Sequence, residues 1–246
     1  MPDYEWVVLL AALLVTILGT VVQAALGFGL ALVAAPVLHL LNPGFVPAPV
    51  IVCVWTLSLW VFWQERKAVD LDRIPVLAGG RLLGAVLAVS VLGGLSAATF
   101  DLVFGTLVLL AVMLSWLHPQ LQANSRNIFI ATLASGFMGT MSGIGGPPLA
   151  LVYQNAGVSR LRANMALVFL IGASMSLLLL AWIGRFGWQE VRLGLWLQPG
   201  VLAGILLARP LRRRLDPHHV RPLLLALCSL AALIILVRGV LNSGFI

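Results

Sequence analysis

A succession of apolar segments, most of them close to twenty residues long, is the feature that most constrains the fold of this chain. A bilayer with a hydrocarbon core about 30 Å thick requires about 20 apolar residues in each spanning helix. Of the 246 residues, 61% are hydrophobic and only 9% are charged, and the mean hydropathy is +1.06. Spanning β-strands would instead alternate apolar and polar residues. We therefore predict an all-α integral membrane protein.

Ten apolar segments are predicted, and the second, sixth and seventh are short for a full crossing of the bilayer. The short segments are therefore predicted to be half-helices or re-entrant arms. The ten segments occupy residues 6–22, 28–41, 46–63, 74–95, 97–117, 128–141, 144–156, 163–183, 191–208 and 220–240.

Two glycine-rich breaks lie between short segments and repeat along the chain. Residues 27–29 read Gly-Phe-Gly, and the Gly-x-Gly pattern recurs 116 residues later in residues 143–146. We predict one compact membrane domain of two repeats, residues 1–120 and 121–246, each with five segments, of which the first two are short and joined by the break. An odd number of segments in each repeat gives the second repeat an inverted topology.

The charge distribution gives an independent test of this topology. The formal net charge is +7, which in a soluble protein would suggest binding to nucleic acid. Here eleven of the fifteen basic residues fall in loops on one predicted side of the membrane, as the positive-inside rule requires, so we predict no nucleic-acid partner. Both termini are then predicted to lie outside. The eleven residues are Arg66, Lys67, Arg73, Arg126, Arg160, Arg162, Arg209, Arg212, Arg213, Arg214 and Arg221.

The second break has the composition of an interrupted helix. Gly143, Gly145 and Gly146 are followed directly by Pro147 and Pro148. Glycine adopts dihedral angles that are closed to other residues, and proline favours the first turn of a helix. Free amides and the helix dipole at such a helix start attract an anion. The motif alone leaves two interpretations open, namely an anion site and a tight crossing of two helices. Paired breaks in inverted repeats favour a transporter that holds its substrate near the midplane.

Two stretches resemble the repeat signatures of a known family, the sulfite exporter TauE/SafE family of bacterial membrane transporters. They are residues 23–36, QAALGFGLALVAAP, and residues 136–153, GFMGTMSGIGGPPLALVY. The resemblance extends in segment order over nearly the whole chain. It implies a carrier of the bacterial inner membrane for sulfite, sulfonates or other small sulfur-containing anions. Phe28 in the first signature, and Pro147 and Pro148 in the second, depart from the commoner family pattern.

Arg81 lies inside an apolar segment, about seven residues from its start, whereas the other basic residues lie in loops or within two residues of a segment end. A charge at such a depth is costly and usually faces a cavity or a partner. Its guanidinium could hold two oxygens of an anion in a bidentate arrangement. The alternatives are that Arg81 extends to the membrane interface or pairs with an acidic residue.

Polar side chains beside the two breaks complete the predicted substrate site. Gln23, Ser142, Tyr153, Gln154 and Asn164 could each donate a hydrogen bond to an oxyanion, although such residues also join helices in membrane proteins. The other predicted substrate-binding residues are Gly27, Phe28, Gly29, Arg81, Gly143, Gly145 and Gly146.

The sequence lacks the motifs of nucleotide-binding and metal-binding proteins. The chain has no GxxxxGK[ST] loop for a nucleotide and no cluster of His, Cys, Asp or Glu for a metal, so we expect no cofactor and no metal. His39 is predicted to have a structural role. The acidic residue closest to the interior is Asp101, near the start of the fifth segment, which disfavours a carboxylate relay for protons. The membrane potential could then drive the anion outward.

Two alternatives to a sulfur-anion transporter stay open. One is an intramembrane hydrolase with Ser142 as nucleophile, which would need a nearby base and which we do not favour, because the later apolar segments contain no histidine. The other is a transporter of a carboxylate without sulfur. We expect a protein that is not an enzyme, with a small anion and the lipid bilayer as partners, and a homo-oligomer is compatible with the sequence.

Overall fold

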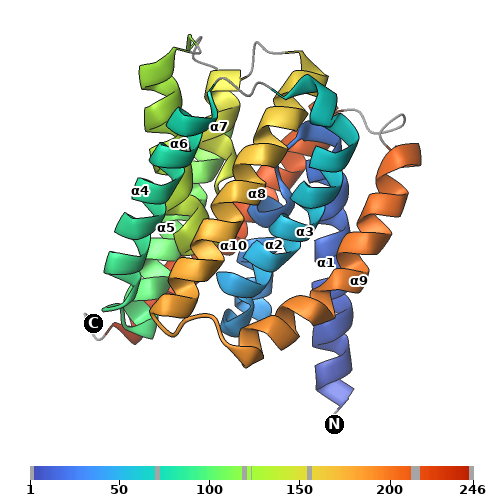
Figure 1. Ribbon diagram of the computed structural model, residues 1–246. Helices are drawn as coiled ribbons and strands as arrows, with labels where there is room; N and C mark the ends of the chain where they lie inside the picture. Colours follow the sequence, from blue (N-terminus) through green and yellow to red (C-terminus); the bar gives the residue numbers. More distant parts are fainter. Residues whose placement is uncertain are drawn as a thin grey trace.

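The protein is described here by a computed structural model that covers residues 3–69, 73–117, 121–122, 124–153, 157–211 and 217–243. These residues form ten α-helices and two short 3-10 turns, without a strand (Figure 1). The helices are α1 (Asp3–Leu26), α2 (Leu30–Leu41), α3 (Ala48–Glu65), α4 (Ile74–Leu92), α5 (Ala97–Trp116), α6 (Ser125–Ser142), α7 (Gly146–Tyr153), α8 (Val158–Trp182), α9 (Trp188–Leu211) and α10 (Pro217–Asn242), and the turns are η1 (Pro43–Phe45) and η2 (Arg66–Ala68).

Seven helices in the described part of the chain are long and apolar enough to cross a bilayer: α1, α3, α4, α5, α8, α9 and α10. The prediction of an all-α, multi-pass membrane protein is therefore confirmed. The prediction that the first segment is short is wrong, because α1 has 24 residues. The predicted segment ends at Val22, before the polar residue Gln23. Glutamine is a good helix former, however, and α1 continues through Gln23 to Leu26.

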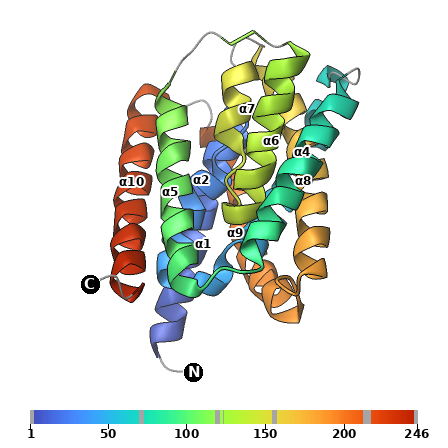
Figure 2. The same ribbon diagram turned by 90° about the vertical axis from the view of Figure 1, so that its left-hand side faces the viewer.

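Both termini lie at the same end of the helical bundle, at the bottom of Figure 1. Helices α3, α5, α7 and α9 end at the opposite end of the bundle, as the turned view also shows (Figure 2). Four pairs of helices pack together most extensively: α4 with α6, α5 with α10, α3 with α8, and α1 with α9. Helices α2 and α7 are short and pack inside this arrangement, against α10 and α5 respectively.

The outer surface of the bundle is apolar. Leu14, Leu178 and Leu206 are 66%, 73% and 74% exposed, although leucine is a typical core residue of soluble proteins. A surface of this kind is stable where it contacts lipid chains. The helices therefore expose apolar side chains on the surface that would contact the bilayer.

A buried polar cluster joins three helices near the end that carries the termini. His39 of α2 lies with Nε2 2.7 Å from Asp101 Oδ1 of α5. Arg238 of α10 donates to the same carboxylate, from Nε to Oδ2 at 2.8 Å and from Nη2 to Oδ1 at 3.1 Å. The imidazole also packs on the ring of Phe104, with 4.7 Å between the ring centroids. The cluster anchors α2 to the two outer helices, in agreement with a structural role for His39.

Replacing Asp101 by asparagine should destabilise the protein, because it leaves the charge of Arg238 without its counter-ion. Because Asp101 is buried but the side chain of Arg238 is 34% exposed, we expect a loss of about 1 to 3 kcal/mol. We expect a clear fall in the thermal unfolding midpoint of the detergent-solubilised variant. Glu190→Gln is the control, because Glu190 accepts only from the amide of Gly187 at an exposed position. An Asp101→Asn midpoint equal to that of the wild type would show that the cluster does not stabilise the bundle.

Candidate functional site

The first break separates α1 from α2 and depends on two glycines. Gly27 has a φ of 90° and Gly29 a φ of 134°, which are values that L side chains rarely adopt. The chain therefore leaves the helix at Leu26 and starts a new one at Leu30. Gln23 stabilises this new start, because its Oε1 accepts a hydrogen bond from the amide of Leu30 at 3.0 Å.

The second break separates α6 from α7 in the same manner. Gly143 ends α6 in the left-handed conformation, with a φ of 79°. Ser142 Oγ donates to the carbonyl of Met138 at 2.7 Å and accepts from the amide of Ile144 at 3.3 Å. Ser142 thus caps the end of α6.

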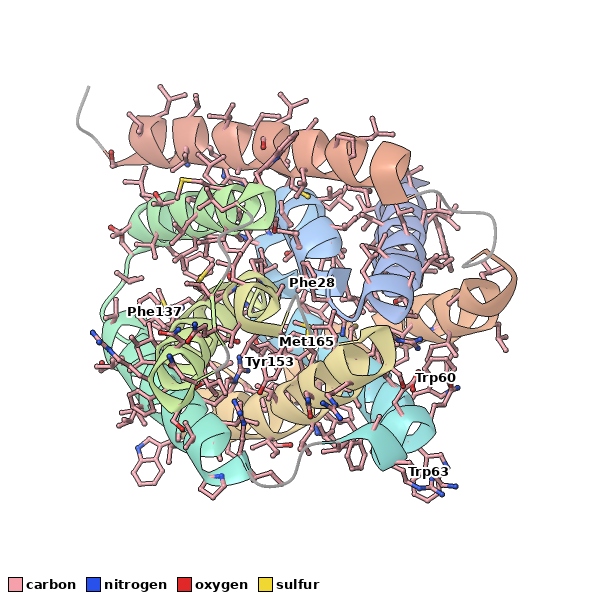
Figure 3. All side chains as sticks on the ribbon, turned by 90° about the horizontal axis from the view of Figure 1, so that it is seen from above. Phe28, Trp60, Trp63, Phe137, Tyr153 and Met165 are labelled. Carbon is pink, nitrogen blue, oxygen red and sulfur yellow. The ribbon has the colours of Figure 1, made fainter. Side chains whose placement is uncertain are left out.

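The two breaks meet in the interior of the bundle. A Cβ atom added to Gly146 would lie 2.7 Å from Cβ of Phe28, and one added to Gly143 would lie 3.6 Å from Cβ of Ala31. In the view along the bundle, Phe28 lies near the middle, whereas Trp63 lies at the periphery (Figure 3). The two breaks, far apart in the sequence, are therefore in direct contact.

Arg81 of α4 reaches the second break from the side. The residue is only 4% exposed. Its Nη1 donates to Ser135 of α6, to the carbonyl at 2.7 Å and to Oγ at 2.8 Å. Ser135 Oγ in turn donates to the carbonyl of Gly145 at 2.5 Å. The hydroxyl of Ser135 therefore links the guanidinium to the break between α6 and α7.

The guanidinium fits because glycines surround it. A Cβ atom on Gly145 would lie 2.8 Å from Nη1, and one on Gly139 would lie 3.0 Å from it. A Cβ atom on Gly172 of α8 would overlap with Nε. These three glycines thus leave the space that the guanidinium of Arg81 occupies, and a side chain at any of them would collide with it.

Within the described residues, no carboxylate forms an ion pair with Arg81, and its buried Nε has no hydrogen-bond partner. The carboxylates that do pair are Glu65, with Arg162, and Asp101, with His39 and Arg238. A guanidinium does not lose its proton in proteins. Arg81 therefore carries a positive charge that no described side chain balances. Its side chain is buried against Ser135, and it pairs with no carboxylate in the described part of the chain.

A pocket lies between the two breaks, and Arg81 contributes to its wall. Its empty volume is about 430 Å³, which includes the part open to solvent. The enclosed part has room for only about one water molecule. The pocket is therefore narrow in this conformation and must widen to admit a larger solute. Its lining residues include Gln23, Phe28, Gly29, Arg81, Gly143, Gly145, Gly146, Phe169, Ala173 and Ser176.

Seven of the twelve predicted site residues line this pocket, and four described ones lie elsewhere. Gly27 faces Arg162, and Ser142 is engaged in the cap of α6. Tyr153 and Asn164 are buried but do not line the pocket. Gln154 lies outside the described residues.

Two serines of the site were missed. Ser135 lies seven residues before Ser142 on α6, which is about two helical turns. This spacing places both serines on a similar face of the helix, so the sequence could have indicated Ser135. Ser176 lines the pocket and forms a hydrogen bond of 2.7 Å with Thr140, and nothing in the sequence singles it out.

The breaks offer fewer free amides than the sequence suggested. Pro147 and Pro148 have no N–H group, and the amide of Leu30 is already used by Gln23. The positive potential of the pocket therefore rests more on Arg81 than on the helix starts.

Comparison with known proteins is consistent with this geometry. A family model described as sulfite exporter TauE/SafE matches residues 11–235, which is nearly the whole chain. Neither a curated protein nor a solved structure matches the chain. The match covers both glycine breaks, Arg81 and Ser135. The chain belongs to the sulfite exporter TauE/SafE family.

Proposed function

We propose that this protein is a secondary transporter or facilitator that moves a small, sulfur-containing anion, such as sulfite or a sulfonate, across the bacterial inner membrane. The family suggests a membrane anion transporter. The observation that carries the proposal is the buried charge of Arg81, without a carboxylate partner among the described residues, in the wall of a pocket between the two breaks. The transported anion supplies the missing counter-charge.

The packing of the helices supports two inverted repeats of five helices each. The main helix contacts have counterparts five helices further along the chain. Helix α1 packs on α2 as α6 packs on α7, and α1 packs on α9 as α6 packs on α4. Likewise α3 packs on α9 as α8 packs on α4. Repeats of this type allow one half to rock against the other around a central site, which would alternately open the pocket to each side.

The ends of the bundle support a topology with both termini outside. Arg66 and Lys67 follow α3, Arg126 lies in the first turn of α6, and Arg160 lies in the first turn of α8, all at the end opposite the termini (Figure 1). Basic residues concentrate on the cytoplasmic side of inner-membrane proteins. The termini then face the outside.

The membrane potential favours export of the anion. An elementary charge that crosses about 100 mV changes its energy by roughly 2.3 kcal/mol, and an inside-negative potential drives anions outward. No proton relay or nucleotide is then needed. Reversing the potential across proteoliposomes should reverse the net flux of the anion, and a flux that ignores the potential would contradict this mechanism.

The hydrolase alternative finds little support in the surroundings of Ser142. A nucleophilic serine needs a base that accepts its proton, but Ser142 Oγ donates to the carbonyl of Met138. A carrier should lose far more flux in Arg81→Ala than in Ser142→Ala. A hydrolase would instead lose its activity in Ser142→Ala.

A carboxylate substrate remains the second candidate, because a guanidinium binds carboxylate and sulfonate oxygens in the same bidentate manner. A thermal-shift screen with sulfite and methanesulfonate, and with acetate as a carboxylate of the same charge as methanesulfonate, separates the two. Stabilisation by none of these sulfur compounds would direct the assignment to carboxylates or another class of solute.

Ser135→Asp tests whether the free charge of Arg81 is what binds the anion. The new carboxylate would lie where Oγ now accepts from Nη1 at 2.8 Å and would supply a permanent counter-ion. We expect anion uptake into proteoliposomes to fall about 30-fold or more, as for other losses of a buried charge partner.

Two variants at the same position control for the loss of the serine itself. Ser135→Asn keeps a donor for the carbonyl of Gly145 and adds no charge, whereas Ser135→Ala removes the donor and adds no charge. Both should retain more uptake than Ser135→Asp. Equal uptake by Ser135→Asp and Ser135→Asn would mean that the charge of Arg81 is not used.

A further inference from the structure

Among the described residues, the pocket is lined by a single ionisable side chain, that of Arg81. Its described polar neighbours there are Gln23 and Ser176, which carry no charge. Most of the remaining lining is apolar, including Phe28 and Phe169. An anion in this pocket therefore meets one positive charge and a low-dielectric wall.

No second positive charge is available nearby among the described residues. Arg162 of α8 is buried as well, but it lies 3.2 Å from a carboxylate oxygen of Glu65 and is thereby compensated. Arg238 is bound to Asp101 in the cluster near the end that carries the termini. Neither arginine lines the pocket.

This charge balance leads to a selection rule. We propose that the pocket accepts monovalent anions and rejects divalent ones, an inference that rests on the proposed transport function. One negative charge neutralises Arg81 and leaves the occupied pocket neutral. Two negative charges leave one uncompensated charge in an apolar interior, which costs several kcal/mol. The substrate class is then the monoanion, such as hydrogen sulfite or an organic sulfonate, and not sulfate or fully deprotonated sulfite.

The apolar wall favours the same class. A sulfonate presents its charged oxygens at one end and a hydrocarbon group at the other. The oxygens would pair with the guanidinium, and the hydrocarbon would contact Phe28 and Phe169. Sulfate has oxygens on every side, so some of its oxygens would face apolar side chains without a hydrogen-bond donor and would lose their hydration.

Methanesulfonate and sulfate form a matched pair for the test, because both are tetrahedral around sulfur and similar in size but carry one and two charges. The experiment measures competition of each with labelled sulfite for uptake by the wild-type protein in proteoliposomes. We expect methanesulfonate to compete at a concentration about 100-fold lower than sulfate. Equal competition by the two anions would overturn the selection rule.

Sulfite itself gives a second readout, because it changes between one and two charges near neutral pH. Uptake at constant total sulfite should fall as the pH rises and hydrogen sulfite is depleted, whereas uptake of methanesulfonate should stay constant over the same range. Sulfite uptake that does not change with pH would also contradict the rule.

The same measurements separate a pocket that binds the anion without selecting its charge from a pocket that does not bind the anion. If sulfate and methanesulfonate compete equally and Ser135→Asp still abolishes uptake, Arg81 binds the anion but does not select its charge. If neither anion competes and Ser135→Asp behaves like Ser135→Asn, the pocket is not the anion site at all.

Discussion

The uncompensated charge of Arg81 is the constraint on which the rest of the interior depends. A charged side chain in the middle of a membrane helix costs about 2.5 to 3.5 kcal/mol even on insertion-based scales. Part of that cost is offset by Ser135, whose carbonyl and hydroxyl both accept from Nη1. No carboxylate among the described residues offsets the rest of that cost. Gly139, Gly145 and Gly172 leave the space that the guanidinium needs. A bundle held together by packing alone would not require such a group.

The glycine breaks give the charge its place. Positive φ angles at Gly27, Gly29 and Gly143 turn the chain back in the interior, so that α2 and α7 start where two long helices end. The two turns touch through Phe28 and Gly146, and the pocket lies between them. Each turn is stabilised by its own capping side chain, Gln23 at the first and Ser142 at the second. The breaks therefore provide the shape of the pocket, and Arg81 provides most of its positive charge.

Much of this arrangement could be predicted from the sequence, because membrane helices carry strong signals. The length of the apolar runs revealed the spanning helices, and the Gly-x-Gly patterns located both breaks. Arg81 stood out because a charge inside an apolar run is rare. Helical spacing from Ser142 could have indicated Ser135, but not its contact with Arg81. The role of Ser176 could not be predicted, because the sequence of a membrane helix does not show which neighbour a serine contacts. The predicted first segment is shorter than α1, because the polar residue Gln23 interrupts the apolar run. In the structure Gln23 lies within α1, and its side chain caps the start of α2.

The position of a bound anion would show whether Arg81 binds it. Crystals grown with a selenium-containing analogue, such as selenite, can be measured at the selenium absorption edge, where anomalous scattering marks the position of the anion. We expect a peak within hydrogen-bonding distance of the Arg81 guanidinium, between Phe28 and Gly145, and no peak there in crystals of Ser135→Asp. A peak elsewhere in the wild-type bundle, with the surroundings of Arg81 empty, would contradict this expectation.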